Sequence, residues 1–392
     1  MGASSPVDAS RPTDAERLAR MRMSRVCEPG DADACRLVRE HTAQALVERL
    51  EAGGLPYPKA AAWAERLPGA DIDVLRRATD RVGARYLIPG DAEWPAQLED
   101  LRLLESGTGD RRGGEPFGLW VRGTLALSEV VPTAVAIVGA RASTEYGDHV
   151  AGLLAAGCAA AGSVVVSGGA YGIDAAAHRG ALAVDGGTVA VLASGIDRFY
   201  PVAHGGLLDE VAATGLLLSE AAPGCAPSRS RFLVRNRLIA ALTHGTVVVE
   251  AALRSGSLNT ARWARDLGRV LMGVPGPVTS MLSAGVHEML RQPESILVTD
   301  AAEVVEMVTP IGTALAPVKQ GSTSPRDGLD RPSRRVLDAV PKVAAAPAAS
   351  IAAIAEMGPS EALGRLADLS RRGFVVQVFD GWRLPPEGPD AP

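Results

Sequence analysis

The chain has 392 residues, which is long for one domain and predicts two or three. Its residues are 47% hydrophobic and 4% aromatic, so it can bury a large aliphatic core, and a net charge of −5 excludes a uniformly basic nucleic-acid-binding surface. The four cysteines form no CxxC pair and no zinc spacing, and no apolar run is long enough for a membrane span. We therefore expect a cytoplasmic protein with reduced thiols, no metal and no membrane association.

The first part of the chain predicts a tail and a helical module. Residues 1–12 mix Ser, Pro and Asp, which is typical of a disordered tail. Residues 13–85 follow a helical pattern broken by paired glycines. A polar, glycine-rich loop is expected at 106–116, and residues 116–121 then predict a short strand.

Residues 86–309 carry the pattern of an α/β core. From Thr133 onward, short apolar runs alternate with helical stretches, and runs that are apolar at nearly every position indicate strands buried on both faces. This alternation predicts an open, doubly wound, mostly parallel sheet, in which ligands bind beyond the carboxyl ends of the strands. The expected strands are 133–138, 163–167, 188–193, 215–219, 246–250, 269–274 and 295–298.

The last part of the chain predicts a linker and a small second domain. Residues 310–331 are rich in Pro, Gly, Ser and Thr, which is typical of a linker. Residues 332–385 predict short helices and then a hairpin at Asp380-Gly381, an order that suggests a winged-helix-like domain. Its expected recognition helix begins Pro359-Ser360-Glu361, and the acidic residue argues against tight duplex binding.

The most informative segment is SGGAYGIDAAAH, where a strand ends and a helix begins. Glycines let the backbone approach a ligand, and the helix N-terminus offers free N–H groups and a positive dipole end, which together favour phosphate. An ordinary tight turn is the alternative, and His178 on the same helix is more typical of a core histidine. The candidate residues are Ser167, Gly168, Gly169, Gly172 and Asp174.

The turn after the first core strand offers a second anion site. Gly139 and Arg141 stand in the sequence VGARAS, and the forked guanidinium of an arginine suits a phosphate. A surface arginine in a loop is the alternative. The segment is not GxGxxG and lacks the acidic residue that would bind a ribose, which makes an NAD-dependent dehydrogenase a poor interpretation.

An arginine-rich helix and a Gly/Ser turn complete the candidate set. The run RSRFLVRNR has four arginines and no acid, and it supplies phosphate contacts together with an aromatic platform for a base. The turn RSGS precedes a further helix and is either an anion cradle or an ordinary cap. No nucleophile–base pair stands out, so we expect a binding protein rather than an enzyme, without a cofactor. The candidates are Phe232, Arg235, Asn236, Arg237, Ser255, Gly256 and Ser257.

Together these motifs resemble the DNA-processing protein A family, also called DprA or Smf. The resemblance runs in order through VGAR, SGGAYGIDAAAH, ASGIDRFYP, FLVRNRLIAAL and VVVEAALRSGSLNTA and covers about half of the chain. It implies a single-stranded DNA-binding recombination mediator that protects incoming DNA and loads the RecA recombinase during natural transformation. It also implies a Rossmann-like core that forms a homodimer, and a helical N-terminal module of SAM-like or helix-hairpin-helix type. The candidate residues above would line or stand near its DNA groove.

The chain departs from the family at Tyr171, where many members have Lys or Arg. A phosphate contact would be lost there, although a tyrosine can stack on a base. The alternative function is a nucleotide-binding or nucleotide-hydrolysing enzyme related to the Rossmann-like nucleoside-monophosphate phosphoribohydrolases. Those enzymes have the signature PGGxGTxxE, and this chain has EAALRSGS in the matching region, so their catalytic glutamate has no counterpart.

Overall fold

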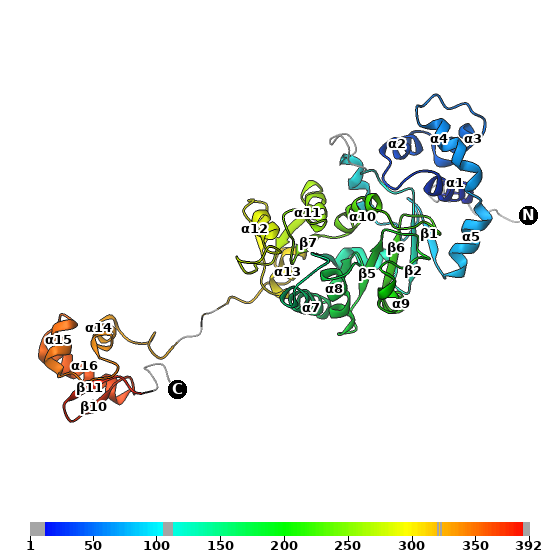
Figure 1. Ribbon diagram of the computed structural model, residues 1–392. Coiled ribbons are helices and arrows are strands. Elements are labelled where there is room, and N and C mark those ends of the chain that lie inside the picture. The colour runs from blue at the N-terminus through cyan, green and yellow to red at the C-terminus, as the bar shows by residue number, and fades with distance from the viewer. Residues whose placement is uncertain (1–11, 105–112, 320, 322–323, 387–392) are drawn as a thin grey trace, which may run out of the picture. The chain divides into compact units, whose positions relative to one another are not determined.

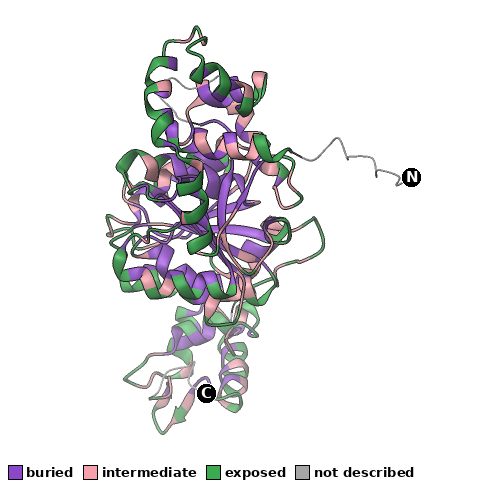
Figure 2. Ribbon diagram, turned by 90° about the vertical axis from the view of Figure 1, so that its right-hand side faces the viewer, coloured by how far each residue is buried: buried purple, intermediate pink, exposed green. Residues whose placement is uncertain are grey.

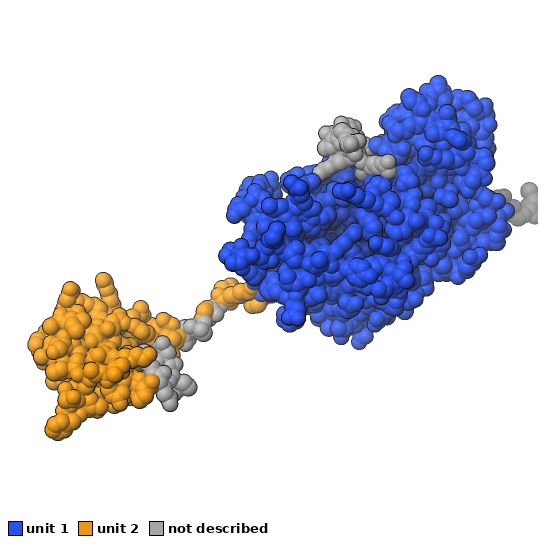
Figure 3. Space-filling model, viewed as in Figure 1, with its two compact units in different colours: residues 1–316 blue, residues 317–392 orange. Residues whose placement is uncertain are grey.

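The computed structural model describes residues 12–104, 113–319, 321 and 324–386. The chain forms two compact units, residues 1–316 and 317–392, and their division falls within the expected linker (Figure 3). Nearly all of the expected tail, and residues 106–112 of the expected loop, lie outside the described residues. No helix in the described ranges combines the length and apolar character that crossing a membrane requires.

A nine-stranded sheet forms the centre of the first unit, in the order β1-β2-β6-β5-β4-β3-β7-β8-β9 (Figure 1). The strands from β3 to β9 run parallel to one another, so the predicted doubly wound, mostly parallel sheet is confirmed. The topology reverses beside β3, because β4 pairs with one edge of this strand and β7 with the other. The parallel strands are β3 (Ala134–Val138), β4 (Val164–Ser167), β5 (Thr188–Leu192), β6 (Leu216–Ser219), β7 (Gly245–Val248), β8 (Val270–Gly273) and β9 (Ser295–Leu297).

Two antiparallel strands extend the sheet beyond β6. β2 (Leu119–Gly123), expected from the sequence, pairs with β6, and β1 (Arg85–Leu87) pairs with β2. The sequence did not predict β1, because three residues are too few to show an alternating pattern.

Helices cover both faces of the sheet and leave its strands largely buried, except for the edge strand β9 (Figure 2). Alternate residues of each strand point to opposite faces, so Val135 and Ile137 pack against one helical layer while Ala136 and Val138 pack against the other. One layer contains α7 (Glu145–Ala160), α8 (Ile173–Leu182), α9 (Gly205–Thr214) and α13 (Ala301–Val308). The opposite layer contains α10 (Arg229–Ala241), α11 (Ser257–Asp266) and α12 (Ala284–Leu290). Shorter elements are α6 (Leu127–Val130), η1 (Leu67–Gly69), η2 (Ala96–Leu104), η3 (Val131–Thr133) and η4 (Val202–His204).

The N-terminal helices belong to the first unit and share its core. Met21 and Leu75 pack in one cluster with Trp120 of β2, and Arg17 forms a bidentate ion pair with Asp91, with both N···O distances at 2.6 Å. These helices also bury a cluster of their own, which includes Met23, Leu46 and Trp63, and the domain boundary expected at residue 85 stays a prediction. The helices are α1 (Asp14–Val26), α2 (Ala32–His41), α3 (Ala43–Glu51), α4 (Ala60–Arg66) and α5 (Ile72–Arg81).

The second unit has its own small core, in which Val336, Ile351, Leu366 and Trp382 are buried together. Its elements are α14 (Arg331–Ala339), α15 (Ala348–Ile354), α16 (Pro359–Arg371), β10 (Val376–Val378) and β11 (Gly381–Arg383). The two strands form an antiparallel hairpin at the expected position. The winged-helix interpretation of this unit stays a prediction.

The close packing of α7 on α8 predicts opposite effects for two helical glycines. A Cβ at Gly180 would stand 2.8 Å from the Cα of Gly152, whereas a Cβ at Gly152 would meet nothing nearer than the Ala176 carbonyl oxygen at 3.9 Å. We expect Gly180→Ala to lower the free energy of unfolding by about 1–3 kcal/mol, because the helices must separate. Gly152→Ala should be neutral or stabilising by up to about 1 kcal/mol, since alanine favours a helix. Urea unfolding of both variants tests this, and equal effects would contradict it.

The core histidine His178 predicts a pH-dependent stability. The side chain is fully buried, its Nδ1 lies 2.7 Å from Thr188 Oγ1, and burial lowers its pKa from 6.5 to about 3. Between pH 6.5 and pH 3, His178 is therefore protonated in the unfolded chain but neutral in the folded chain. Because the unfolded chain binds more protons, this histidine destabilises the fold as the pH falls through this range. Between pH 7 and pH 5 we expect it to cost about 2 kcal/mol. Urea unfolding should show that His178→Gln loses less stability over this interval than the wild type, and parallel losses would refute the assignment.

Candidate nucleic-acid interface

The turn between β4 and α8 brings the backbone to the carboxyl edge of the sheet. Gly172 has a φ of 73°, a conformation that favours glycine, and it opens α8. The next amide, that of Ile173, donates a hydrogen bond of 3.2 Å to the carbonyl of Ala140, in the turn after β3. The amide of Ala140 in turn donates to the carbonyl of Glu250 after β7, at 2.6 Å. The turns after these three neighbouring strands are thus joined by backbone hydrogen bonds.

The Arg235 guanidinium lies beneath this turn. The side chain is 6% exposed, and its Nη1 donates to the carbonyls of Gly168, at 2.7 Å, and Val191. A Cβ at residue 168 would stand 2.5 Å from both terminal nitrogens of Arg235, so only glycine leaves room for the guanidinium. Gly168, the first glycine of the turn, is therefore needed because the Arg235 guanidinium occupies the space that a side chain would take.

Asp174 is the acidic partner in this part of the site. It is 7% exposed, and its Oδ2 accepts a hydrogen bond of 3.3 Å from the amide of Ala170. Burial raises the pKa of the Asp174 carboxyl, against the opposing influence of the nearby Arg235 charge. Burial lowers the pKa of Arg235 to about 10, which leaves the guanidinium charged at neutral pH.

The first turns of α10 carry an aromatic ring between cationic groups. Ser228 caps this helix by accepting a hydrogen bond from the amide of Arg231 at 3.3 Å. The Arg141 guanidinium lies over the Phe232 ring, 4.4 Å from its centroid, and the Arg235 guanidinium lies 5.8 Å from the same centroid. The Tyr200 ring packs on Phe232 with the centroids 5.6 Å apart.

The Gly/Ser turn faces α10 at the start of α11. The Asn236 amide nitrogen donates to the carbonyl of Gly256 at 3.2 Å, which ties the two helices together. The hydroxyls of Ser255 and Ser257 lie 2.8 Å apart, and the Ser255 hydroxyl oxygen also accepts a hydrogen bond of 3.4 Å from the amide of Ser257, the first residue of α11. The positive end of the helix dipole attracts an anion, and the two hydroxyls add donors beside it.

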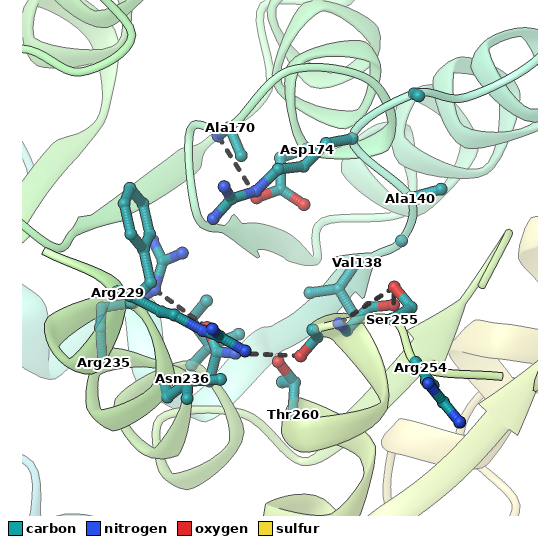
Figure 4. A pocket seen from close by; sticks show the side chains of 18 of the residues that line it. Val138, Ala140, Ala170, Asp174, Arg229, Arg235, Asn236, Arg254, Ser255 and Thr260 are labelled. Atoms are coloured by element: carbon teal, nitrogen blue, oxygen red, sulfur yellow. Dashed lines mark hydrogen bonds between the residues drawn. The ribbon is translucent and has the colours of Figure 1, made fainter. Parts of the chain in front are cut away.

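These elements enclose a pocket of about 760 Å³ at the carboxyl edge of the sheet, where the topology reverses (Figure 4). Among the described side chains that line it, four are arginines and only Asp174 is acidic. The close-up shows Arg229, Arg235 and Asn236 on α10, with Arg254 and Ser255 on the facing turn. The arginines are Arg141, Arg229, Arg235 and Arg254.

Most of the expected site residues meet at this pocket. Ser167, Gly168, Gly169, Gly172 and Tyr171 are not among the lining residues: Ser167 is fully buried under the turn, where its hydroxyl donates to Ile137, and Tyr171 points outward with 48% exposure. The expected residues that line the pocket are Gly139, Arg141, Asp174, Phe232, Arg235, Asn236, Ser255, Gly256 and Ser257.

Arg237 requires a correction, because the structure places it in the core and not in the groove. Its side chain is fully buried and forms a bidentate ion pair with Glu220, with both N···O distances at 2.7 Å, while its Nε donates to the carbonyl of Gly114. The sequence showed that Arg237 lies on a different face of the helix from Arg235. It did not show which face packs on the sheet.

Sequence reasoning also missed several lining residues. Arg229 stands in the arginine-rich run and Arg254 directly precedes the Gly/Ser turn, so basic charge next to a recognised turn was the available signal. Tyr200 gave no such signal, because it reaches Phe232 from a loop far away in the sequence.

An ion pair connects the N-terminal helices to α10. The Arg231 guanidinium pairs with Glu28, in the connection between α1 and α2, through N···O distances of 2.9 and 3.0 Å. It also donates to the carbonyl of Ala226 at 2.7 Å. The side chain of Arg231 therefore faces the helical module, although it lies one turn from Arg235.

Residues 85–309, more than half of the chain, match the family described as DNA recombination-mediator protein A. The chain belongs to the DprA family. The match spans all nine strands of the sheet and all the residues that line the pocket.

Individual DprA proteins extend this result. A Mycobacterium tuberculosis protein that carries the DprA name is 45% identical over 371 residues, which is 92% of each chain. The DNA processing protein DprA of Streptococcus pneumoniae is 40% identical over 48% of this chain and 66% of its own length. The X-ray structure of the S. pneumoniae protein aligns with a TM-score of 0.62 at 29% identity, and the alignment covers 76% of this chain and 99% of that one.

The buried position of Arg237 predicts a folding defect on its removal. Arg237→Ala leaves Glu220 buried without its cation, and breaking such a pair costs about 3–5 kcal/mol. Arg265→Ala is the matched control, because Arg265 is 47% exposed and exposed pairs contribute about 1 kcal/mol or less. Urea unfolding measures both variants. If Arg237→Ala is as stable as the wild type but fails to bind DNA, the core assignment of Arg237 is wrong and the residue contacts the ligand.

Proposed function

We propose that this protein binds single-stranded DNA in the pocket at the carboxyl edge of its sheet. The observation that carries the proposal is the concentration of four arginines in a concave site that also contains Phe232 and, among the described lining residues, one acidic side chain. Arginines neutralise phosphates, and an aromatic face stacks on a base that has no pairing partner. Membership of the DprA family supports the same ligand.

The finer proposal is that the protein is a recombination mediator, and it rests on the family resemblance. In this proposal a homodimer in the cytoplasm protects incoming single-stranded DNA and loads RecA onto it during natural transformation. The proposal assigns no catalysis to the site. In support, the described residues that line the pocket include no cysteine or histidine, and the Asp174 carboxylate among them accepts a hydrogen bond from the amide of Ala170 near the charge of Arg235. Release of a free base from a nucleoside monophosphate would instead favour the phosphoribohydrolase alternative.

Fluorescence anisotropy of a labelled oligo-dT across a salt series tests DNA binding. We expect wild-type affinity to fall as salt rises, because phosphate contacts release counterions. Arg141→Ala combined with Arg254→Ala removes two exposed arginines and should flatten the log–log salt slope by about 1.4, since each single-strand phosphate contact contributes about 0.7.

Arg265→Ala, outside the pocket, is the control variant and should keep the wild-type slope. The proposal fails if the wild type does not bind at low salt, or if the double variant binds as the wild type does. RecA loading needs a separate assay, in which the protein should speed RecA filament formation on single strands coated with a single-strand-binding protein. No acceleration by a DNA-binding-competent protein would refute the mediator role alone.

A further inference from the structure

Two tyrosines at the rim of the site have exposed rings that folding does not explain. Tyr171, at the tip of the glycine turn, is 48% exposed, and Tyr200 is 45% exposed. In the described parts of the chain neither hydroxyl forms a hydrogen bond. The hydroxyls of Tyr86 and Tyr146, by contrast, bind Ser24 Oγ at 3.0 Å and the Pro275 carbonyl at 2.6 Å. Tyr171 and Tyr200 therefore present aromatic surface to the solvent.

Each of these rings is supported by a second ring. Tyr171 packs on His204 in an edge-to-face arrangement, with the centroids 4.7 Å apart and the planes at 71°. Tyr200 packs on Phe232, with the centroids 5.6 Å apart and the planes at 58°. Such contacts orient an exposed ring without covering both of its faces.

One loop, between β5 and α9, joins the two pairs. Tyr200 and His204 both belong to it, and they are separated by three residues in the sequence. His204 is 6% exposed, its Nδ1 lies 3.1 Å from the carbonyl of Gly169 in the glycine turn, and its amide donates to the carbonyl of Pro201 at 3.0 Å. Near the start of the loop, the Ser194 hydroxyl donates to the carbonyl of Arg198 at 2.6 Å. The contact between His204 and Gly169 joins the loop to the glycine turn, and the other two bonds stabilise the loop itself.

We infer that Tyr200 and Tyr171 form a base-stacking track that carries a single strand out of the arginine pocket and over the glycine turn. The inference rests on the proposed function, since the track begins at Phe232 inside the pocket. Its ligand is a run of unpaired bases, because a base within a duplex has no face free for a tyrosine. Neither tyrosine ring carries a charge, so stacking on them adds affinity without adding salt dependence.

The length of DNA that the protein prefers follows from this track. An oligonucleotide of about four residues can occupy the pocket alone, whereas one of about twenty residues also reaches the track. Tyr171, at the far end of the ring series, should matter only for the longer ligand. Tyr200, which contacts Phe232, should matter for both.

The test measures anisotropy with oligo-dT of these two lengths for Tyr171→Ala, Tyr200→Ala and the ring-preserving control Tyr171→Phe. For the long ligand we expect Tyr171→Ala to weaken binding at least about fivefold with an unchanged salt slope, because stacking contributes roughly that factor or more per base. Tyr171→Phe should bind as the wild type does. Thermal unfolding checks that each variant folds. Because Tyr171 is exposed, we expect its substitution to leave the fold intact.

A long oligonucleotide with abasic sites outside the pocket-bound stretch supplies the second arm, and on it Tyr171→Ala and the wild type should bind equally. Wild-type affinity in Tyr171→Ala on intact long DNA overturns the track and leaves the DNA-binding pocket standing. A flattened salt slope in Tyr171→Ala overturns it as well, since the tyrosine would then act through phosphate contacts. Failure of the wild type to bind any oligonucleotide overturns the proposed function, and the track with it.

Discussion

The site depends on the buried guanidinium of Arg235. It binds the carbonyls of Gly168 and Val191, at the carboxyl ends of β4 and β5, and lies against Phe232 on its own helix. A cation in this place is expensive to desolvate, and carbonyl dipoles with one nearby carboxylate, Asp174, compensate for the lost water. The helix, the glycine turn and the sheet edge are thereby fixed relative to one another before any ligand arrives.

The resulting pocket combines a fixed charge with adjustable ones. Arg235 is buried and bound on several sides, whereas Arg141, Arg229 and Arg254 are exposed at the rim. A buried donor defines where a phosphate or base edge can lie, while long exposed arginines adapt to a flexible backbone. This division suits a ligand whose chemical repeat is constant and whose sequence varies.

The sequence was sufficient to predict the strands and turns that follow a local pattern. It was insufficient to predict which face of a helix packs on the sheet and which distant segments meet. Fully apolar runs identified the parallel strands, and the glycine turn identified the edge at which the pocket forms. The three-residue strand β1 carried no pattern, and Arg237 looked like a groove residue because a helical run of arginines does not reveal which side meets the sheet. Tyr200 was missed because a loop contact between distant segments leaves no periodic trace.

The ion pair between Glu28 and Arg231 connects the N-terminal helices to α10, a helix that lines the pocket. It joins the connection between α1 and α2 to the first turns of α10, which carry Phe232 and Arg235. A ligand of these helices that shifted the first turns of α10 through this ion pair would change the affinity of the pocket for its own ligand. By thermodynamic linkage, occupation of the pocket will change the affinity of the helices for that ligand by the same factor. A ligand bound to the helical module would in this way regulate the affinity of a pocket that the module does not line.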